Sequence, residues 1–375
     1  MSIYQNIKIA IIHDHLLEDG GAERVLITLS ELFPQADIFT SFVSENCETY
    51  RLLQKRIIAK KYFHPFFLRL ISFFKVFLFS YWEKINLDEY NLVVSLTSSF
   101  FSKAVLTSPN TVHICYCLTP PKFLYLHEIE SKFFNSFPLS GQILCWLRQK
   151  DFVIAQRPDY LIAISEEVKK RITKFYRRDS KIIYPPVHIK DYETVAKKDY
   201  YVTVSRLVRP KNLDIAIEAC NITQKKLVII GEGPDKERLK KISGSYITFL
   251  GKITDEEKVQ IVRHAKGLIF CSEDEDFGIS PIEALSLGTP VISHYSGGPK
   301  EFITEGVNGV FFFELNSQSL IQAINKYEKT KFNANRCYVS SLKFSEKKFK
   351  SNMLKFVDNI DIPITYPTTR NIRGG

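Results

Sequence analysis

The sequence predicts an α/β protein with two Rossmann-like domains, and its alternating pattern carries that prediction. Short apolar runs alternate with stretches of helical periodicity, and the same alternation restarts in the second half of the chain. At 375 residues the chain is long enough for two domains of ordinary size. With 45% hydrophobic and 25% charged residues, its composition is that of a globular protein.

The first half of the chain opens with a strand, a glycine-containing loop and a helix. Residues 7–12 (IKIAII) form a continuous apolar run, which is typical of a buried parallel strand. Gly20 and Gly21 precede a helical stretch over residues 22–32. Because these glycines lack a Cβ, the backbone there can approach a phosphate or a sugar closely. Further strands are predicted over residues 36–42, 91–96, 112–117 and 160–164, and a further helix over residues 166–176.

The pattern restarts after residues 187–198, a polar stretch without periodicity that indicates a linker. Strands are predicted over residues 200–204, 226–230, 247–250, 267–271, 290–293 and 310–313, and helices over residues 213–220, 255–264 and 344–357. The end of the chain contains prolines and a Gly-Gly pair, which indicates disorder. We expect a first domain over residues 1–188, a second over 189–343, a C-terminal helix over 344–360 that packs back on the first domain, and a disordered tail over 361–375.

The charge of the chain restricts its partners only weakly. A net charge of +10 is compatible with nucleic acid, anionic lipid or phosphorylated ligands. No run of five or more Lys and Arg occurs, and the basic residues cluster over residues 51–61, 169–181 and 343–355. We interpret the last two clusters as solvated helix faces, and we expect no nucleic-acid partner.

The cysteines and the N-terminus predict a cytoplasmic protein. Seven cysteines at irregular spacing indicate reduced thiols. Residues 1–12 lack the layout of a signal peptide, because Lys8 interrupts the apolar run and no small-residue cleavage site follows.

Residues 62–82 (YFHPFFLRLISFFKVFLFSYW) form the most hydrophobic segment. The charges of Arg69 and Lys75 interrupt it, so it is amphipathic and does not predict a transmembrane helix. The basic run over residues 51–61 precedes it. Two interpretations stay open: a surface helix that contacts an anionic membrane, or helices packed in the core. We expect peripheral contact with the inner face of the cytoplasmic membrane.

Residues 271–301 (CSEDEDFGISPIEALSLGTPVISHYSGGPKE) are the stretch richest in candidate ligands. Glu275 and Glu283 flank Phe277 and Gly278, and we interpret the stretch as a sugar-nucleotide site. Ser280 and Glu283 also fit a capping box, with Ser at the N-cap and Glu three residues later. The residue types leave both roles open for Glu283.

Two cations follow the first strand of the second domain. Arg206 and Lys211 could clamp a diphosphate, or they could form surface ion pairs. Gly231 opens the sequence GEGP, which is like a dinucleotide fingerprint but lacks its third glycine. The chain has no G-x-x-x-x-G-K-[ST] sequence, which argues against a P-loop ATPase.

The short patterns His13-Asp14-His15 and Asp274-x-Asp276 contain residue types that bind metals. The first pattern has no third ligand nearby, so we expect loop polar groups there. The second pattern is short and common, so we expect no metal site there either.

Several motifs carry a resemblance that runs through nearly the whole chain. They are GGAER at residues 20–24, SRL at 205–207, KN at 211–212, GEGP at 231–234, EDFGISPIEA at 275–284, GTPV at 288–291, GGPKE at 297–301 and GVNG at 306–309. In this order and spacing they resemble the retaining glycosyltransferases of the GT4 group. That group has the GT-B architecture, in which two Rossmann-like domains face each other across a cleft. Within it, the chain is most similar to bacterial mannosyltransferases of O-antigen and exopolysaccharide assembly.

The resemblance implies roles for particular residues. It implies that Arg206, Lys211 and Glu275 are catalytic. It implies contacts with the donor for the following residues: Gly20, Gly21, Gly231, Phe277, Gly278, Ile279, Ser280 and Glu283. Five residues become candidates for the acceptor side: His13, Asp14, His113, Thr119 and His127.

The resemblance also implies a reaction. A hexose, with mannose from GDP-mannose favoured, would pass from a nucleotide-diphosphate sugar to a glycan or a polyprenyl-diphosphate-linked acceptor with retention of configuration, in cell-surface polysaccharide biosynthesis. No metal and no cofactor would be needed.

The sequence departs from the family pattern at one position. Related enzymes often carry His-Thr-Pro after the fourth strand, and here Leu118 stands in place of that His. Another histidine could substitute, the contact could be dispensable, or activity could be low. Two alternatives therefore stay open beside the transferase: a nucleotide-sugar 2-epimerase of the GT-B fold and a catalytically impaired binding protein.

Overall fold

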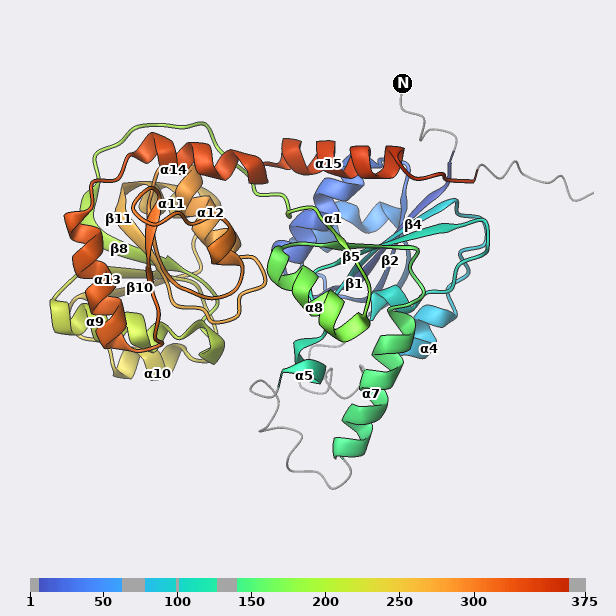
Figure 1. Ribbon diagram of the computed structural model, residues 1–375, viewed down its shortest axis with the longest axis horizontal. Helices are drawn as coiled ribbons and strands as arrows, with labels where there is room; N and C mark the ends of the chain where they lie inside the picture. The colour runs from blue at the N-terminus through green and yellow to red at the C-terminus, as the bar shows by residue number, and fades with distance from the viewer. Residues whose placement is uncertain (1–6, 63–77, 99–100, 127–139, 364–375) are drawn as a thin grey trace, which may run out of the picture. The chain divides into compact units, whose positions relative to one another are not determined.

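The computed structural model describes residues 7–62, 78–98, 101–126 and 140–363. The chain forms two compact units: Met1–Pro185 together with Lys350–Gly375, here called unit 1, and Pro186–Phe349, here called unit 2. Each unit contains one parallel sheet with helices packed on it (Figure 1). The predicted α/β fold with two Rossmann-like domains is confirmed.

Unit 1 contains a seven-stranded sheet with the order β3-β2-β1-β4-β5-β6-β7, in which all neighbours are parallel. The strands are β1 Ile9–Leu16, β2 Asp37–Val43, β3 Ile57–Tyr62, β4 Leu92–Thr97, β5 Val112–Cys117, β6 Tyr160–Ala163 and β7 Lys181–Ile182. The chain order reverses between β1 and β4. In sheets of this kind, ligands bind beyond the carboxyl ends of the strands at the reversal.

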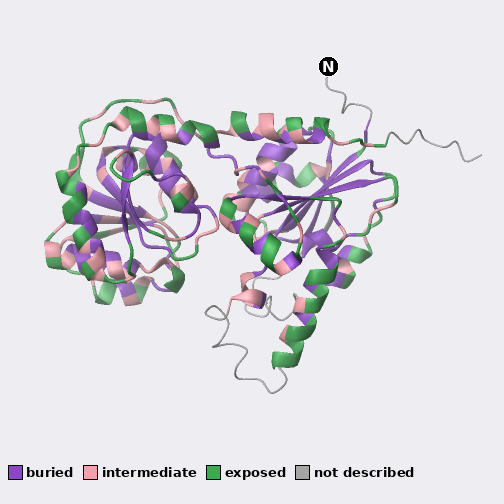
Figure 2. Cartoon of the chain, viewed as in Figure 1, coloured by how far each residue is buried: buried purple, intermediate pink, exposed green. Residues whose placement is uncertain are grey.

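The helices of unit 1 connect these strands. They are α1 Gly21–Leu32, α2 Glu48–Leu53, α4 Leu78–Glu83, α5 Lys122–Tyr125, α7 Ser140–Ile154 and α8 Glu166–Tyr176, with the 3-10 turns Gln54–Arg56 and Ser102–Ala104. Ser165 caps α8, because its side chain accepts a hydrogen bond from the Val168 N–H at 3.1 Å. The strands are largely buried, and the outer faces of the helices are exposed (Figure 2).

Unit 2 contains a six-stranded sheet with the order β10-β9-β8-β11-β12-β13, again with all neighbours parallel. The strands are β8 Lys198–Val204, β9 Leu227–Ile230, β10 Ile247–Gly251, β11 Ala265–Phe270, β12 Val291–His294 and β13 Gly309–Phe312. The order reverses between β8 and β11, so the loops after these two strands meet at one edge of the sheet.

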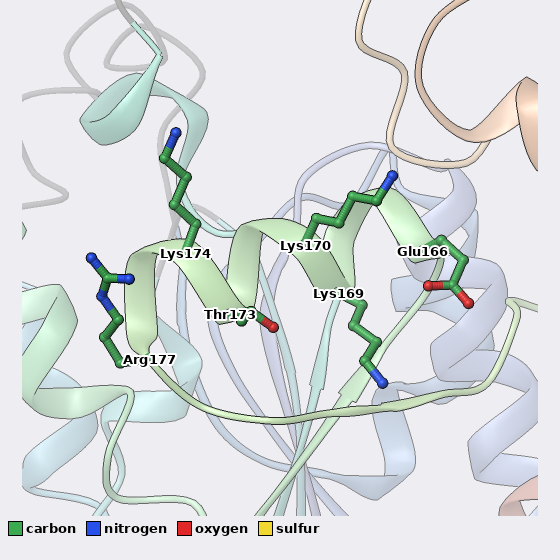
Figure 3. A pocket seen from close by; sticks show the side chains of 6 residues that line it. All are labelled: Glu166, Lys169, Lys170, Thr173, Lys174 and Arg177. Atoms are coloured by element: carbon green, nitrogen blue, oxygen red, sulfur yellow. The ribbon is translucent and has the colours of Figure 1, made fainter.

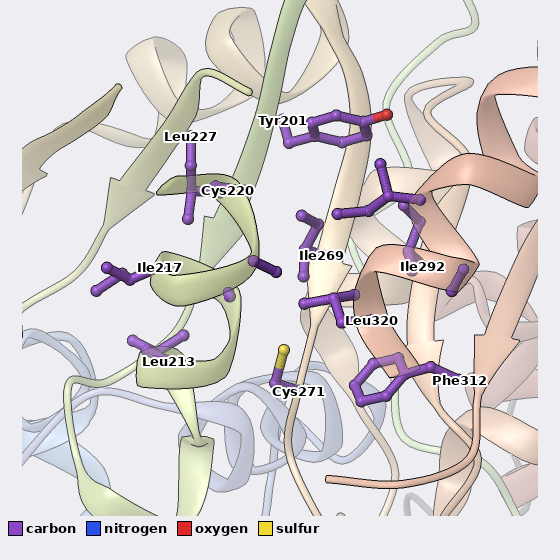
Figure 4. Packing of buried hydrophobic residues seen from close by; sticks show 14 of the residues in the cluster. Tyr201, Leu213, Ile217, Cys220, Leu227, Ile269, Cys271, Ile292, Phe312 and Leu320 are labelled. Carbon is purple, nitrogen blue, oxygen red and sulfur yellow. The ribbon is translucent and has the colours of Figure 1, made fainter. Parts of the chain in front are cut away.

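Helices pack on the sheet of unit 2 and complete its core. They are α9 Leu213–Thr223, α10 Lys236–Lys241, α11 Asp255–His264, α12 Ile279–Ser286, α13 Ser317–Lys329 and α14 Ala334–Ser341, with 3-10 turns at Arg209–Lys211, Gly298–Glu301 and Leu342–Phe344. Leu213, Ile217 and Cys220 form one stripe of α9 and pack with Ile269 and Leu320 (Figure 4). Each fully buried Leu or Ile contributes about 1.5–3 kcal/mol through the apolar surface it removes from water.

The last helix, α15 Glu346–Asp358, crosses the division between the units, and its residues from Lys350 onward belong to unit 1. There the Phe356 ring packs edge-on against Tyr160 at a centroid distance of 5.9 Å. Lys350 pairs with Glu31 at 2.7 Å. The Asn91 side chain donates a hydrogen bond to the carbonyl of Pro363 at 2.9 Å, so the start of the expected tail, over residues 361–363, is held in place.

The basic run over residues 51–61 differs from its sequence interpretation. Residues 57–62 form strand β3 beside β2, which was not predicted. Arg56 is partly buried, and its guanidinium donates to the carbonyls of Ser30 and Phe33 at 2.9 Å, at the end of α1. This part of the run therefore completes the sheet and caps a helix.

The apolar segment over residues 62–82 is described at its ends only, because residues 63–77 lie outside the described ranges. At its far end Leu78, Phe79 and Trp82 of α4 are buried in the core of unit 1. For these residues the interpretation as core packing is confirmed. Of the described helices, none is long and apolar enough to span a membrane.

Candidate functional site

The reversal in the sheet of unit 2 brings Lys211 to Glu275. Lys211 ends the 3-10 turn after β8, and Glu275 lies in the loop after β11. Lys211 Nζ is 2.5 Å from Glu275 Oε2, and their side chains are 20% and 25% exposed. Lys211 Nζ also lies 5.9 Å from the centre of the Phe270 ring, at the carboxyl end of β11. The site thus places a cation and a carboxylate in contact, both within reach of solvent.

The loop after β8 is held against the loop after β11 by Asn212. This residue adopts a left-handed conformation with φ 49°, and its side-chain amide donates to the Cys271 carbonyl at 3.3 Å. Arg206 lies in the same loop, directly after β8, and its side chain is exposed. The two cations predicted to clamp a diphosphate therefore follow the same strand, at the edge where the sheet reverses.

Gly231 fixes the course of the Arg206 loop. It has φ 138°, and a Cβ there would lie 1.9 Å from the Ser205 carbonyl oxygen. The Leu207 N–H donates to the Glu232 carbonyl at 2.9 Å, which joins the two loops through their backbones. The GEGP sequence is thus explained by close packing of backbones. A donor contact for Gly231 stays a prediction.

The glycine pair at residues 297–298 fixes the backbone at Glu275 in the same way. Gly297 has φ 59°, and a Cβ there would lie 2.3 Å from the Glu275 carbonyl oxygen. The Gly298 N–H donates to that oxygen at 2.8 Å. The Asp274 N–H donates to Ser296 Oγ at 3.0 Å. The loop after β12 therefore determines where the Glu275 carboxylate can lie.

The predicted capping box at residues 280–283 is wrong. Helix α12 begins at Ile279, and its N-cap is Gly278, with φ 97° and no side-chain cap. Ser280 lies inside the first turn, so Glu283 is not the third residue of the helix. Glu283 is 18% exposed, and its Oε2 lies 3.6 Å from Lys258 Nζ. Of the two interpretations of Glu283, only the ligand contact remains as a prediction.

Phe277 is a core residue, and a donor contact for it stays a prediction. It is 3% exposed, and its ring packs edge-on against Phe302 and Phe344 at 6.0 and 5.4 Å. Phe277 thereby holds two neighbouring segments in place: the loop with Glu275, which precedes it in the chain, and the first turn of α12, which follows it. The backbone N–H groups of that turn, at Ile279 and Ser280, have no earlier turn to bond to, so they can serve an anionic ligand.

In unit 1, Asp14 spans the reversal between β1 and β4. Its Oδ2 accepts from the Ser98 N–H at 2.6 Å and from Ser98 Oγ at 2.9 Å, and its Oδ1 accepts from the Ser102 N–H at 2.9 Å. Burial alone would raise the pKa of Asp14, but the hydrogen bonds from Ser102 and Ser98 hold it below its ordinary value. Asp14 is 3% exposed and organises the edge of this sheet.

His13 and Gly20 lie beside the start of α1. His13 Nε2 is 3.3 Å from Glu23 Oε1, and the ring is 1% exposed. A Cβ on Gly20 would lie 3.2 Å from Glu23 Oε2, so the glycine gives this carboxylate room to reach His13. Gly21 is the first residue of α1. His13 and Asp14 therefore lie in the carboxyl half of β1, and Gly20 lies beyond its end.

His113 does not lie with these residues. His113 is the second residue of β5, at the amino end of the strand, and its Nε2 is 2.8 Å from Ser95 Oγ. Burial, together with Arg157, lowers the pKa of His113 to about 3. It is thus a neutral core residue, away from the edge where the acceptor was expected. His127 lies outside the described residues.

Leu118 and Thr119 follow the carboxyl end of β5. The Leu118 N–H donates to the Thr97 carbonyl at 2.9 Å. Thr119 Oγ1 accepts from the Arg171 guanidinium at 3.3 Å, and Arg171 comes from the inner side of α8. Thr119 is thereby tied to α8 at the same edge of the sheet as Asp14.

The outer side of α8 carries an open pocket of about 330 Å³ (Figure 3). Its lining consists of Glu166, Lys169, Lys170, Thr173, Lys174 and Arg177. Lys169 lies 3.4 Å from Asp179. Lys170 and Lys174 extend from one side of the helix and Lys169 from the other (Figure 3). We interpreted this cluster from the sequence as a solvated helix face. The pocket is open to solvent, which agrees with that interpretation.

Within the described residues, no three or more His, Cys, Asp or Glu side chains gather as a metal site. This holds for the region of His13 and Asp14 and for that of Asp274 and Asp276.

Comparison with known proteins places residues 186–341 in a defined family. They match the model of "Glycosyl transferases group 1". The human alpha-1,3/1,6-mannosyltransferase ALG2 is 25% identical over 241 residues, which cover 54% of this chain and 57% of that protein. O-antigen chain mannosyltransferase C of Escherichia coli is 24% identical over 219 residues, which cover 55% and 59%. The chain spans about half the length of the curated relatives it matches.

Solved structures share the fold over nearly the whole chain. The lipopolysaccharide outer core galactosyltransferase WaaB has a TM-score of 0.67 at 19% identity and covers 94% of this chain and 99% of its own. Anabaena HepE, in complex with UDP and glucose, has a TM-score of 0.67 at 20% identity and covers 94% and 100%. At these identities the likeness is one of fold.

Proposed function

We propose that this chain is a group 1 glycosyltransferase and that it transfers a hexose from a nucleotide-diphosphate sugar to a glycan or a polyprenyl-diphosphate-linked acceptor. The match of residues 186–341 to the family model and the fold shared with solved glycosyltransferases support this proposal. Mannose from GDP-mannose is the favoured donor, and the reaction retains the anomeric configuration. The names of two relatives, both mannosyltransferases, support the choice of mannose. The observation in this chain that carries the proposal is the contact between Lys211 and Glu275 where the sheet reverses.

In the proposed reaction, Lys211 and Arg206 offset the charge of the leaving group. The bond between the anomeric carbon and the diphosphate oxygen breaks, and the acceptor oxygen bonds to the same carbon from the same face. The acceptor proton leaves with the nucleoside diphosphate. Negative charge grows on the diphosphate as its bond breaks, so cations held beside it stabilise the transition state more than the ground state. Because these cations do the work of a metal, the transfer is proposed to need none.

Glu275 has a second role in the proposal. Without donor it pairs with Lys211, at 2.5 Å. When the diphosphate arrives, Lys211 can exchange the carboxylate for phosphate oxygens, which have the same charge sign. Glu275 then accepts hydrogen bonds from hydroxyls of the transferred hexose. Glu283, one turn into α12, accepts them from the ribose, and the amides of Ile279 and Ser280 contact the diphosphate.

We further propose that the protein works in cell-surface polysaccharide biosynthesis, at the cytoplasmic face of the membrane. The aromatic and basic composition of the segment over residues 62–82 supports contact with anionic lipid. In the described part of this segment, Leu78, Phe79 and Trp82 are buried and therefore do not make such contact.

A panel of UDP-, GDP- and ADP-sugars, assayed for hydrolysis and for transfer, tests the donor. We expect activity with GDP-mannose and an α-linked product, which proton NMR of the anomeric centre reports. Activity with UDP-sugars alone would overturn the choice of mannose. Conversion of a UDP-sugar to its 2-epimer without an acceptor would overturn transfer itself.

A further inference from the structure

Two exposed aromatic side chains lie together at the edge of unit 2. Tyr295 directly follows β12 and Phe313 directly follows β13, and they are 50% and 67% exposed. The pairing of His294 with Phe312 sets the two residues opposite each other. Their ring centroids are 5.2 Å apart at an interplanar angle of 44°. Single exposed apolar side chains are ordinary, but a pair in contact forms a patch that costs free energy in water.

The pair is held in place by the fold. The Tyr295 N–H donates to the Phe312 carbonyl at 2.9 Å. The Phe311 ring packs edge-on against Tyr295 at 5.0 Å and 85°. The Phe313 N–H donates to Ser319 Oγ at 3.3 Å. The backbones at the ends of both strands are therefore held, which limits the part of the ordering entropy that binding has to overcome to the side chains.

The pair is continuous with the candidate donor site. Ser296, the residue after Tyr295, accepts a hydrogen bond from the Asp274 N–H at 3.0 Å. Asp274 directly precedes Glu275, and Gly298 binds the Glu275 carbonyl at 2.8 Å. Tyr295 therefore lies on the loop that positions the Glu275 carboxylate, and Phe313 contacts Tyr295 from the end of the neighbouring strand. Lys300, from the same loop, places its Nζ 5.6 Å from the centre of the Tyr295 ring.

We propose that Tyr295 and Phe313 form a stacking platform for a hexopyranose ring of a glycan acceptor. This rests on the proposed glycosyl transfer, which needs a second carbohydrate beside the donor site. The face of an aromatic ring is electron-rich, and the apolar face of a pyranose presents positively polarised C–H groups to it. Lys300 adds donors for the hydroxyls at the rim of the sugar. A rigid apolar surface with a few polar groups at its rim is the usual form of a small-molecule site.

Binding of methyl α-D-mannopyranoside and of α-1,3-mannobiose to the full-length protein, measured by saturation-transfer NMR and titration, tests the platform. We expect Tyr295→Ala and Phe313→Ala each to weaken binding about three- to tenfold. Tyr295→Phe keeps the ring and should bind as the wild type does. Ile222→Ala removes an apolar side chain that is 60% exposed on α9 of the same unit and should change nothing.

Nucleotide binding is measured on the same samples by thermal shift with GDP and UDP. Unchanged nucleotide binding in both alanine variants shows that the site over Lys211 and Glu275 is intact. If mannoside binding is absent in the wild type or equal in all variants, the platform is overturned while the transferase stands. Two further outcomes, each with mannoside binding unchanged in Tyr295→Ala, would equally overturn the platform. Loss of a dimer in sedimentation would assign the patch to a second copy of the chain. Loss of vesicle binding would assign it to lipid. Failure of the wild type to bind any nucleotide would instead overturn the proposed function.

Discussion

Lys211 Nζ lies 2.5 Å from Glu275 Oε2, and this ion pair joins two loops that are 64 residues apart in the chain. Lys211 follows β8 and Glu275 follows β11, which are neighbours because the strand order reverses between them. A cation and a carboxylate so placed can exchange partners when an anionic ligand enters. Five predictions follow from this pair, from the glycines and helix around it, and from two buried groups of unit 1.

Removing the cation should slow transfer without unfolding the protein. We expect Lys211→Ala to lower kcat by about 10²–10³-fold, because it removes charge that stabilises the leaving diphosphate. Steady-state kinetics with the preferred nucleotide sugar measures this. Lys240→Ala is the matched control, since Lys240 pairs with Glu237 at 3.4 Å on the exposed side of α10. Equal kinetics for both variants would show that Lys211 has no part in the reaction.

Gly297→Ala should disturb the Glu275 loop. The new Cβ would lie 2.3 Å from the Glu275 carbonyl oxygen, at a backbone φ of 59°. We expect loss of nucleotide binding and a lower urea midpoint. Gly306→Ala has a φ of 74° with nothing within 4 Å of its Cβ, so it isolates the backbone strain, which costs about 1–2 kcal/mol. Should the two variants lose equal stability and keep nucleotide binding, the close approach of the two loops is unimportant.

Glu283→Ala should abolish tight donor binding and leave the fold intact. Helix α12 is capped by Gly278 and not by this carboxylate, so its loss removes no cap. We expect an affinity about 10–100-fold weaker by calorimetry, which corresponds to lost hydrogen bonds to a charged group. Asp255→Ala removes the other acidic neighbour of Lys258, at 2.8 Å, and serves as the control. A variant that unfolds yet keeps donor affinity in its folded fraction would refute the ligand role.

The buried ion pair between Lys103 and Asp151 should be essential to unit 1. The two charges are 2.6 Å apart and both side chains are 0% exposed. Lys103→Met leaves Asp151 buried without its cation, at a cost of about 3–5 kcal/mol in the free energy of unfolding. Lys8 and Glu89 are also 2.6 Å apart, but they are 56% and 64% exposed. Lys8→Met should therefore cost about 1 kcal/mol or less. Urea unfolding measures both variants. If Lys103→Met and Lys8→Met lower the free energy of unfolding equally, burial does not decide the contribution of these ion pairs.

His113 should make stability fall with acid. Burial and Arg157 lower the pKa of His113 from 6.5 to about 3. Below pH 6.5 the unfolded chain takes up a proton that the folded chain refuses, so His113 lowers stability as pH falls from 6.5 toward 3. The slope approaches about 1.4 kcal/mol per pH unit.

His113→Asn tests this dependence, because it removes the titrating group and keeps a polar side chain beside Ser95. The free energy of unfolding is measured with urea at pH 6.5 and at pH 5. Its difference between the two pH values should be smaller in the variant than in the wild type. His188→Asn, at a side chain that is 64% exposed, should keep the wild-type difference. The interpretation fails if His113→Asn keeps it as well.

Local periodicity predicted most elements. Helices α8 and α11 and strand β5 have the bounds that the sequence predicted, over residues 166–176, 255–264 and 112–117. Each has a pattern set by its own residues, such as the Ser165 cap of α8. Strand β3 was missed, because its sequence IIAKKY has no alternation of apolar and polar residues and only a short apolar run. The predicted cap at Ser280 was wrong, because Gly278 begins the helix earlier through a conformation with positive φ.

The sequence by itself determined that both halves are Rossmann-like, and its motifs carry a resemblance to glycosyltransferases that the family match over residues 186–341 supports. It also determined which residues follow strands, including Arg206, Lys211 and Glu275. Only the tertiary structure decided which strand ends are neighbours. It brought Lys211 to Glu275, set Tyr295 beside Phe313, and removed His113 from the edge of its sheet. The reason is physical: the period of a strand or helix is local, whereas strand order depends on crossovers between distant segments and on the core they bury.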